Sequence, residues 1–172
     1  MASSMHVITA QQTVIPNNVL TPPTLVFLAG GISGCRNWQE EVIEKLGAMV
    51  PLYPELKRAV LINPRNPDFD MDNPGMAFEQ IKWEHYWLRR ADIVSYFFDN
   101  SESLQPITLY ELGKWANKKQ SVITVCNGYK RQSDVYIQTA LDGLYCGMYD
   151  PKDAIDQHAR SIAHAVSAFQ RR

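Results

Sequence analysis

Two kinds of apolar segment alternate along this chain, and their order limits the fold more than any other feature. Short runs rich in β-branched and aromatic residues are typical of buried strands. These runs are residues 24–29, 59–62, 91–98 and 121–126. The segments with apolar residues at helical spacing are 37–47, 76–90, 106–117 and a last one that begins at Asp150. Strands that alternate with helices predict an α/β fold with a parallel sheet and helices on both faces.

The ends of this pattern are less regular. Residues 133–141 fit either a fifth strand or a short helix, so we expect a sheet of about five strands. Residues 1–23 are polar and contain prolines, which predicts a flexible N-terminal arm before a single domain at 24–172. Residues 63–75 contain three prolines and form a long predicted loop, and long loops in compact domains are usually functional or disordered.

Composition excludes several classes of protein. A net charge of -1 argues against a nucleic-acid polymer as partner. No apolar run approaches the ~20 residues that span a membrane, and no signal peptide is evident, so we expect a cytoplasmic location. Cys35, Cys126 and Cys146 belong to no metal-binding or disulfide motif, so we expect three free thiols and no metal site.

The glycines at the end of the first predicted strand raise a question of ligand binding. Gly30, Gly31 and Gly34 fit neither a dinucleotide fingerprint nor a phosphate-binding P-loop. They indicate either a tight turn or a place where a ligand approaches the backbone, and alone they favour the turn. The other strand-end loops begin near residues 63, 99 and 127, and in a parallel sheet all of them open on one edge.

Two glutamates could meet at this edge. Glu111 lies near the start of the helix opened by Pro106, where the helix dipole favours an ionised carboxylate and thus a nucleophile. Glu84 borders the apolar face of residues 76–90, and a carboxylate there is either functional or paired with a neighbouring arginine. Two carboxylates in one cleft are typical of glycosidic bond cleavage. The alternative for Glu111 is a solvated helix glutamate without a catalytic role.

Five segments together resemble the nucleoside 2-deoxyribosyltransferase superfamily, in its nucleoside 2-deoxyribosyltransferase-like branch. They are VFLAGGISG, NWQEEVIEKL, LINPRNPDF, IKWEHYWLRRADIVSYFF and PITLYELGKWA, and they span roughly residues 24–135. The resemblance implies a flavodoxin-like or Rossmann-like fold. It also implies cleavage of N-glycosidic bonds in nucleosides or their 5′-monophosphates, without a metal or a redox cofactor.

The resemblance also implies roles for individual residues. Glu111 of YELG matches the nucleophile that attacks C1′, and Glu84 matches an acidic residue that helps to protonate the leaving base. Glu84 stands where relatives carry aspartate. Asp134, or Ser133 beside it, matches a polar residue that a neighbouring subunit supplies, which implies a homodimer or larger homo-oligomer with a shared site.

Further residues are expected to bind substrate, and two positions near them differ from the family pattern. The residues expected to bind substrate, besides Asp134, are Gly30, Gly31, Ser33, Trp38, Asn63, Arg65 and Gln105. Phe27 and Gln105 stand where classical relatives carry a tyrosine and an acidic residue, and Asn63 and Arg65 are expected to take over part of that role. Trp38 could stack on a base or pack in the core. Arg36 and Ser33 could meet a 5′-phosphate.

The expected function is transfer of the sugar of a (2-deoxy)nucleoside to another nucleobase through a covalent glycosyl-Glu111 intermediate. The partners are then a nucleoside or nucleotide and a free nucleobase. One alternative is a hydrolase of nucleosides or nucleoside 5′-monophosphates, in which water resolves the intermediate. Another is a nucleotide-binding module that has lost catalysis, which Phe27 and Gln105 motivate.

Overall fold

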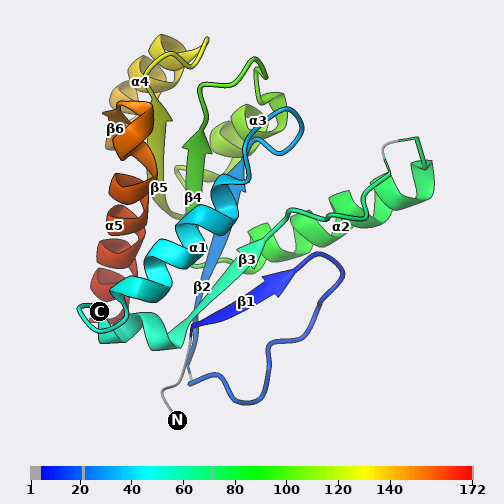
Figure 1. Ribbon diagram of the computed structural model, residues 1–172, viewed down its shortest axis with the longest axis vertical. Helices are drawn as coiled ribbons and strands as arrows, with labels where there is room; N and C mark the ends of the chain where they lie inside the picture. Colours follow the sequence, from blue (N-terminus) through cyan, green and yellow to red (C-terminus); the bar gives the residue numbers. More distant parts are fainter. Residues whose placement is uncertain (1–4, 21, 71, 172) are drawn as a thin grey trace.

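The computed structural model describes residues 5–20, 22–70 and 72–171, and it contains one six-stranded parallel sheet (Figure 1). The strands are β1 (His6–Thr9), β2 (Thr24–Gly30), β3 (Ala59–Asn63), β4 (Ile93–Phe98), β5 (Gln120–Cys126) and β6 (Cys146–Tyr149). Their order in the sheet is β1-β3-β2-β4-β5-β6. The predicted parallel α/β fold is therefore confirmed, with six strands in place of about five.

Helices cover both faces of the sheet. They are α1 (Trp38–Met49), α2 (Pro74–Arg90), α3 (Pro106–Trp115), α4 (Gln132–Leu141) and α5 (Pro151–Gln170), with a short 3₁₀ helix η1 (Pro54–Arg58). α1 and α5 pack on one face, and α2, α3 and α4 contribute to the core on the other. The ambiguous segment 133–141 is helical, and the strand after it, β6, has only four residues, too few for a clear sequence pattern.

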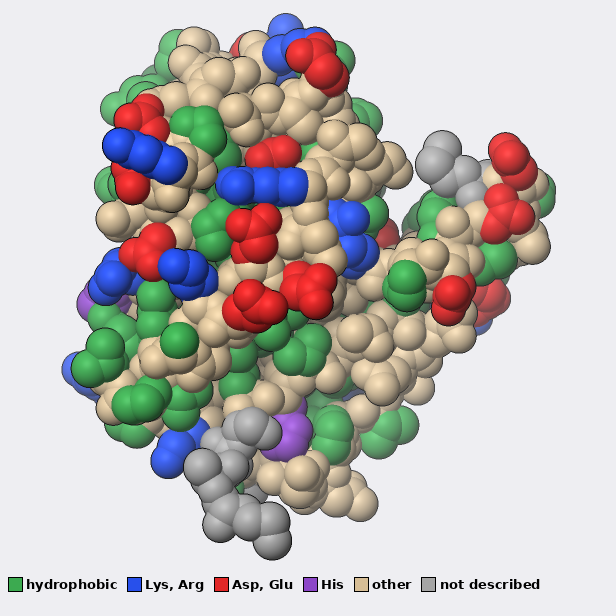
Figure 2. All heavy atoms as spheres, viewed as in Figure 1, with side chains coloured by type: hydrophobic (Ala, Val, Ile, Leu, Met, Phe, Trp, Pro, Cys, Tyr) green, Lys and Arg blue, Asp and Glu red, His purple; other side chains and the backbone are tan. Residues whose placement is uncertain are grey.

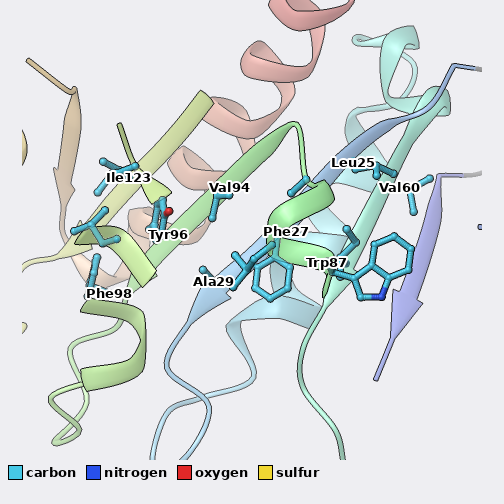
Figure 3. Close-up of a cluster of buried hydrophobic side chains, with 14 of the residues drawn as sticks. Leu25, Phe27, Ala29, Val60, Trp87, Val94, Tyr96, Phe98 and Ile123 are labelled. Carbon is cyan, nitrogen blue, oxygen red and sulfur yellow. The ribbon is translucent and has the colours of Figure 1, made fainter. Parts of the chain in front are cut away.

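The strand β2 shows how the sheet is buried on both sides. Leu25, Phe27 and Ala29 belong to the cluster on the side of α2, α3 and α4, which Figure 3 shows. Val26 and Leu28 belong to the cluster on the side of α1 and α5. A strand that is buried on both faces has a continuous apolar run, which explains why LVFLA does not alternate with polar residues.

The N-terminal segment corrects one expectation. Residues 1–4 and 21 of the predicted arm lie outside the described residues, but His6–Thr9 forms β1 and pairs in parallel with β3. Beyond β1, the carbonyl of Gln12 accepts hydrogen bonds from Trp83 Nε1 at 2.8 Å and from Trp87 Nε1 at 3.1 Å. The sheet edge and the two indoles therefore fix a segment whose own sequence shows no strand pattern.

Helix α2 extends beyond the sheet. Its buried face consists of Trp83, Trp87 and Leu88. Phe78 and Ile81, two of the apolar residues at helical spacing within 76–90, are instead 64% and 65% exposed. The N-terminal half of α2 and the loop that precedes it form a lobe, residues 64–70 and 72–81, that stands apart from the main body (Figures 1 and 2). The expected burial of this face holds at Leu88 but not at Phe78 and Ile81, because the N-terminal half of α2 extends beyond the sheet (Figure 1).

The strand order also locates the crevice where ligands bind in such folds. After β2 the chain moves outward to β3 and then returns to the other side of β2 as β4. Open parallel sheets bind ligands beyond the carboxyl ends of the strands at this reversal. In this protein the reversal lies between Gly30 at the end of β2 and Phe98 at the end of β4.

Three further findings concern membrane-spanning helices, metal-binding groups and the cysteines. Within the described ranges, none of the helices combines the length and apolar character needed to cross a bilayer. In the same part of the chain, no three His, Cys, Asp or Glu side chains gather in a way that could hold a metal ion. The three cysteines are free thiols, as expected.

Candidate active site

A cavity of about 510 Å³ opens at the carboxyl ends of β2 and β4, between the main body and the lobe. Phe27, Gly30 and Gly31 line it from β2 and the loop after it, and the first turns of α3 line a second side. The lobe closes a third side, and Figure 2 shows the hollow between the lobe and the body. The volume lies in the range of about 300–1,000 Å³ that is usual for small-molecule sites.

Glu84 and Glu111 reach this cavity from different helices. Glu111 lies in the second turn of α3 and is 7% exposed, and Glu84 lies on α2 and is partly buried. Both line the cavity, as the sequence analysis expected for two carboxylates at one sheet edge. No described residue donates a hydrogen bond to the Glu111 carboxyl, which leaves it available to a ligand.

The ionisation of Glu111 differs from the expectation. Burial, and secondarily the charge of Glu84, raise the pKa of Glu111 to about 8, while Lys114 acts in the opposite direction. The expected stabilisation of the carboxylate by the helix dipole fails because that effect fades beyond the first turn. The free site therefore keeps a proton on its carboxyl pair near neutral pH.

Gln80 links Glu84 to the lobe, a role the sequence analysis did not anticipate. Its Nε2 donates to the Pro64 carbonyl at 2.9 Å and to Glu84 Oε1 at 2.8 Å. Burial raises the pKa of Glu84, and this hydrogen bond acts against that increase. The signal in the sequence was the spacing, because residues four apart are neighbours on one helix face.

Gly30 and Gly31 are required by packing within the protein. A Cβ on Gly30 would lie against the ring of Trp38 and 2.7 Å from the Phe97 carbonyl oxygen. The N–H of Gly31 donates to Gln105 Oε1 at 3.1 Å, and its carbonyl accepts from Trp38 Nε1 at 3.1 Å. Side chains of the protein thus occupy both polar backbone groups of Gly31, although the glycines do line the cavity.

Trp38 does not offer a stacking surface to a base. Its side chain is fully buried, stacked on Phe97 at a centroid distance of 5.0 Å and edge-on to His158 at 5.8 Å. The expectation of substrate contact is wrong because the indole lies beneath the glycine loop, residues 30–34. From there it fixes the loop through the Gly31 carbonyl.

Gln105 lines the cavity, but its amide serves the protein backbone. Besides the Gly31 bond, its Oε1 accepts from Asp99 N at 3.3 Å and its Nε2 donates to Asp99 O at 2.7 Å. The backbone of Gln105 is in the left-handed region, with φ 49°, and the residue is 3% exposed. A strained conformation held by three side-chain bonds indicates a positioning role, since it ties the ends of β2 and β4 to the start of α3.

Asn63 and Arg65 do not line the cavity. Arg65 donates from Nε to Gln39 Oε1 at 3.1 Å and from an Nη to the Arg36 carbonyl at 2.9 Å, while Asn63 Oδ1 accepts from the Arg65 N–H. The bonds of the guanidinium direct Arg65 toward α1 and the loop before it, whereas Asn63 bonds to the backbone of its own loop. The lining residues from this loop are instead Pro64, Asn66 and Phe69.

Two other expected site residues are placed as follows. Ser33 lines the cavity beside Gly31. Asp134 lies on α4, exposed, and pairs with Arg131 at 3.1 Å, away from the cavity of its own chain. Tyr96, which was not singled out, donates from its hydroxyl to the backbone carbonyl of Glu111 at 3.5 Å. Tyr96 lies on β4, which pairs with β2, the strand of Phe27. Phe27 is the position at which classical relatives carry a tyrosine.

A parallel α/β fold with two carboxyls facing one cavity at the strand-order reversal defines a small-molecule-binding α/β protein with groups suited to glycosidic bond chemistry. Residues 23–129 match the family described as "Nucleoside 2-deoxyribosyltransferase like", and the chain belongs to that family. No curated protein matches the chain significantly. Membership supports a nucleoside-related role in glycosyl transfer and accords with the resemblance seen in the sequence.

Proposed function

We propose that the protein cleaves the N-glycosidic bond of (2-deoxy)nucleosides and transfers the sugar to another nucleobase. The observation that carries this proposal is the pair of carboxyls, Glu111 and Glu84, on two sides of one cavity of nucleoside size. Family membership supports the same chemistry.

The first half-reaction assigns one role to each carboxyl. An ionised Glu111 attacks C1′, and an ester bond forms between its Oε and C1′ as the bond from C1′ to the base nitrogen breaks. The electron pair of the broken bond stays on the base, which takes a proton from Glu84. This division matches the retaining pattern of two carboxyls, one nucleophile and one acid.

The second half-reaction reverses these steps with a new base. A nitrogen of the incoming base attacks C1′, the ester bond breaks, and Glu111 is released as a carboxylate. Glu84 takes the proton that the incoming base loses. Water in place of the base would give a free sugar, so the same site also permits hydrolysis.

The active form of the pair holds one proton, and its position matters. In the free site Glu111 is the carboxyl with the pKa of about 8. Positive charge develops at C1′ during cleavage and favours the ionised form of Glu111. We therefore expect substrate binding to move the shared proton toward Glu84, where the leaving base needs it.

Base exchange is the test of this proposal. The protein is incubated with a deoxynucleoside and an isotopically labelled acceptor base, and the products are separated by chromatography. Labelled nucleoside supports transfer, and free sugar with no labelled nucleoside supports the hydrolase. If a broad panel of nucleosides and nucleotides gives neither product, the proposal is wrong, and tight binding without turnover would favour a binding module.

The pH dependence of kcat/KM is expected to be bell-shaped, with the alkaline limb near pH 8. Above that pH the pair loses its last proton, and in acid it gains a second one, so activity falls on both sides. Glu84→Gln is expected to lower kcat, to abolish the alkaline limb and to lower the pKa of Glu111, because the neighbouring charge is removed. An unchanged pH profile in this variant would contradict the assigned role of Glu84.

A second copy of the chain is the proposed cover of the cavity mouth. Ile81 and Ile107 line the cavity yet are 65% and 63% exposed, and Tyr110 on α3 is 63% exposed. Apolar side chains at the rim of a site favour burial by a partner. In this arrangement Asp134 of one copy would reach the site of the other, and sedimentation velocity at micromolar concentration tests it, since a monomer would contradict it.

A further inference from the structure

The side-chain amide of Gln80 holds two acceptor groups of the protein at once. Its Nε2 donates to the Pro64 carbonyl at 2.9 Å and to Glu84 Oε1 at 2.8 Å. An amide nitrogen carries two N–H groups, so these two bonds use both of them. The Pro64 carbonyl can only accept, and an amide oxygen placed there would face another oxygen. Pro64 therefore determines which end of the Gln80 amide faces Glu84.

The position of Pro64 ties this arrangement to the sheet. Pro64 follows directly after Asn63, the last residue of β3, whereas Gln80 and Glu84 lie one turn apart on α2. The bond from Gln80 to Pro64 spans 16 residues and joins the two ends of the lobe. The Glu84 carboxyl is thus positioned relative to the edge of the sheet, where Glu111 also reaches the cavity.

The Gln80 bond also distinguishes the two oxygens of the Glu84 carboxyl. Oε1 accepts from Gln80, and within the described ranges Oε2 has no hydrogen-bond partner. In a protonated carboxyl the carbonyl oxygen is a better acceptor than the hydroxyl oxygen, so the bond to Oε1 favours the proton on Oε2. Oε2 is then the oxygen of Glu84 that can donate.

Few charged groups compete with this bond. Glu84 and Glu111 are the only ionisable side chains among the described residues that line the cavity, so β2 and the loop after β3 contribute none. Lys114, further along α3, acts on Glu111. Burial raises the pKa of Glu84, and the hydrogen bond from Gln80 lowers it. Gln80 is therefore the described neighbour that favours the ionised form of Glu84.

We propose that Gln80 is a positioning residue for the acid of the site, which holds Glu84 through Oε1 so that Oε2 gives its proton to the leaving base. The inference rests on the proposed function and adds a residue that makes no bond to the substrate. As the Oε2–H bond breaks, its electron pair stays on Glu84, and the N–H of Gln80 stabilises the carboxylate that forms. Anchoring by Pro64 keeps the acid within reach of one proton acceptor, as general acid catalysis requires.

Two substitutions that change the Gln80 donor in opposite ways test this role. Gln80→Met keeps the length of the side chain but removes both N–H groups, so the alkaline limb of kcat/KM should move to higher pH. Gln80→Lys keeps a donor and adds a positive charge, so the same limb should move to lower pH. In Gln80→Met, kcat should also fall about tenfold with little change in KM, because the acid loses its fixed orientation.

Gln157→Met and Gln157→Lys are the matched controls, because Gln157 is also half-buried on a helix, α5, but on the opposite face of the sheet. NMR titration of isotopically labelled glutamate carboxyls measures the pKa of Glu84 without turnover. An alkaline limb that stays at the control value, or moves the same way in both Gln80 variants, would overturn the inference even where kcat falls. Opposite shifts of the Glu84 titration in a protein without base exchange would overturn the proposed function and leave the coupling of Gln80 to Glu84 in place.

Discussion

Glu111→Gln is expected to lower kcat of base exchange by about 10³-fold or more, because the amide cannot form the ester with C1′. The substitution preserves the shape of the side chain within the cavity, so binding of the nucleoside should change far less than turnover. Steady-state kinetics together with calorimetric binding of the same nucleoside measure the two effects separately. Activity within tenfold of the unaltered protein would exclude a covalent role for this residue.

The same variant carries its own folding control in the pH dependence of stability. The ordinary pKa of the carboxyl is 4.5, and in the folded protein it is about 8. As pH rises through this window, the unfolded chain releases the proton while the folded chain keeps it, so the free energy of unfolding falls. Glu111→Gln removes this loss, and we expect the variant to gain stability relative to the unaltered protein between pH 4.5 and about pH 8.

Trp38→Ala is expected to cost about 3–5 kcal/mol in the free energy of unfolding, the usual range for deletion of a large buried aromatic side chain. The indole stacks on Phe97, lies against Gly30 and donates to the Gly31 carbonyl, so its loss opens a cavity directly beneath the site. Urea unfolding measures the change in stability. The glycine loop should also lose its fixed position, which predicts reduced kcat/KM under conditions where the variant is still folded.

Trp115→Ala is the control for this experiment. Trp115 lies at the end of α3 and is only partly buried, so the same substitution should cost clearly less stability. Trp38→Phe keeps an aromatic ring in the core but removes the N–H donor, and it should recover most of the stability without fully restoring kcat/KM. Equal losses for Trp38→Ala and Trp115→Ala would contradict the placement of Trp38 in the core.

Local patterns predicted the layered fold because each central strand is a continuous apolar run between helices. The weak points were elements that depend on distant partners. β1 forms through its pairing with β3, and the Gln12 carbonyl beyond it is held by Trp83 and Trp87 from far along the chain. α2 keeps an apolar pattern at Phe78 and Ile81 although no sheet lies beneath them.

In the candidate site, too, local patterns predicted the position of residues along the chain but not the contacts of their side chains. Motif spacing predicted that Glu84, Glu111 and the glycine loop lie at one edge of the sheet, and Glu84, Glu111, Gly30 and Gly31 all line the cavity there. The direction of individual side chains was not readable from spacing, because it is set by contacts across the sheet. Trp38 turns into the core, Arg65 turns toward α1, and Gln105 folds back onto the backbone of Asp99.

The covalent glycosyl-Glu111 intermediate is the central claim, and trapping it is the most direct test. A 2′-fluorinated arabinosyl nucleoside destabilises positive charge at C1′ and slows release of the sugar, so the ester should accumulate. Intact-protein and peptide mass spectrometry would then find the fluorinated sugar on Glu111, and no such adduct on the Glu111→Gln variant. Continued base release without an adduct on Glu111, or an adduct on another residue, would contradict the account.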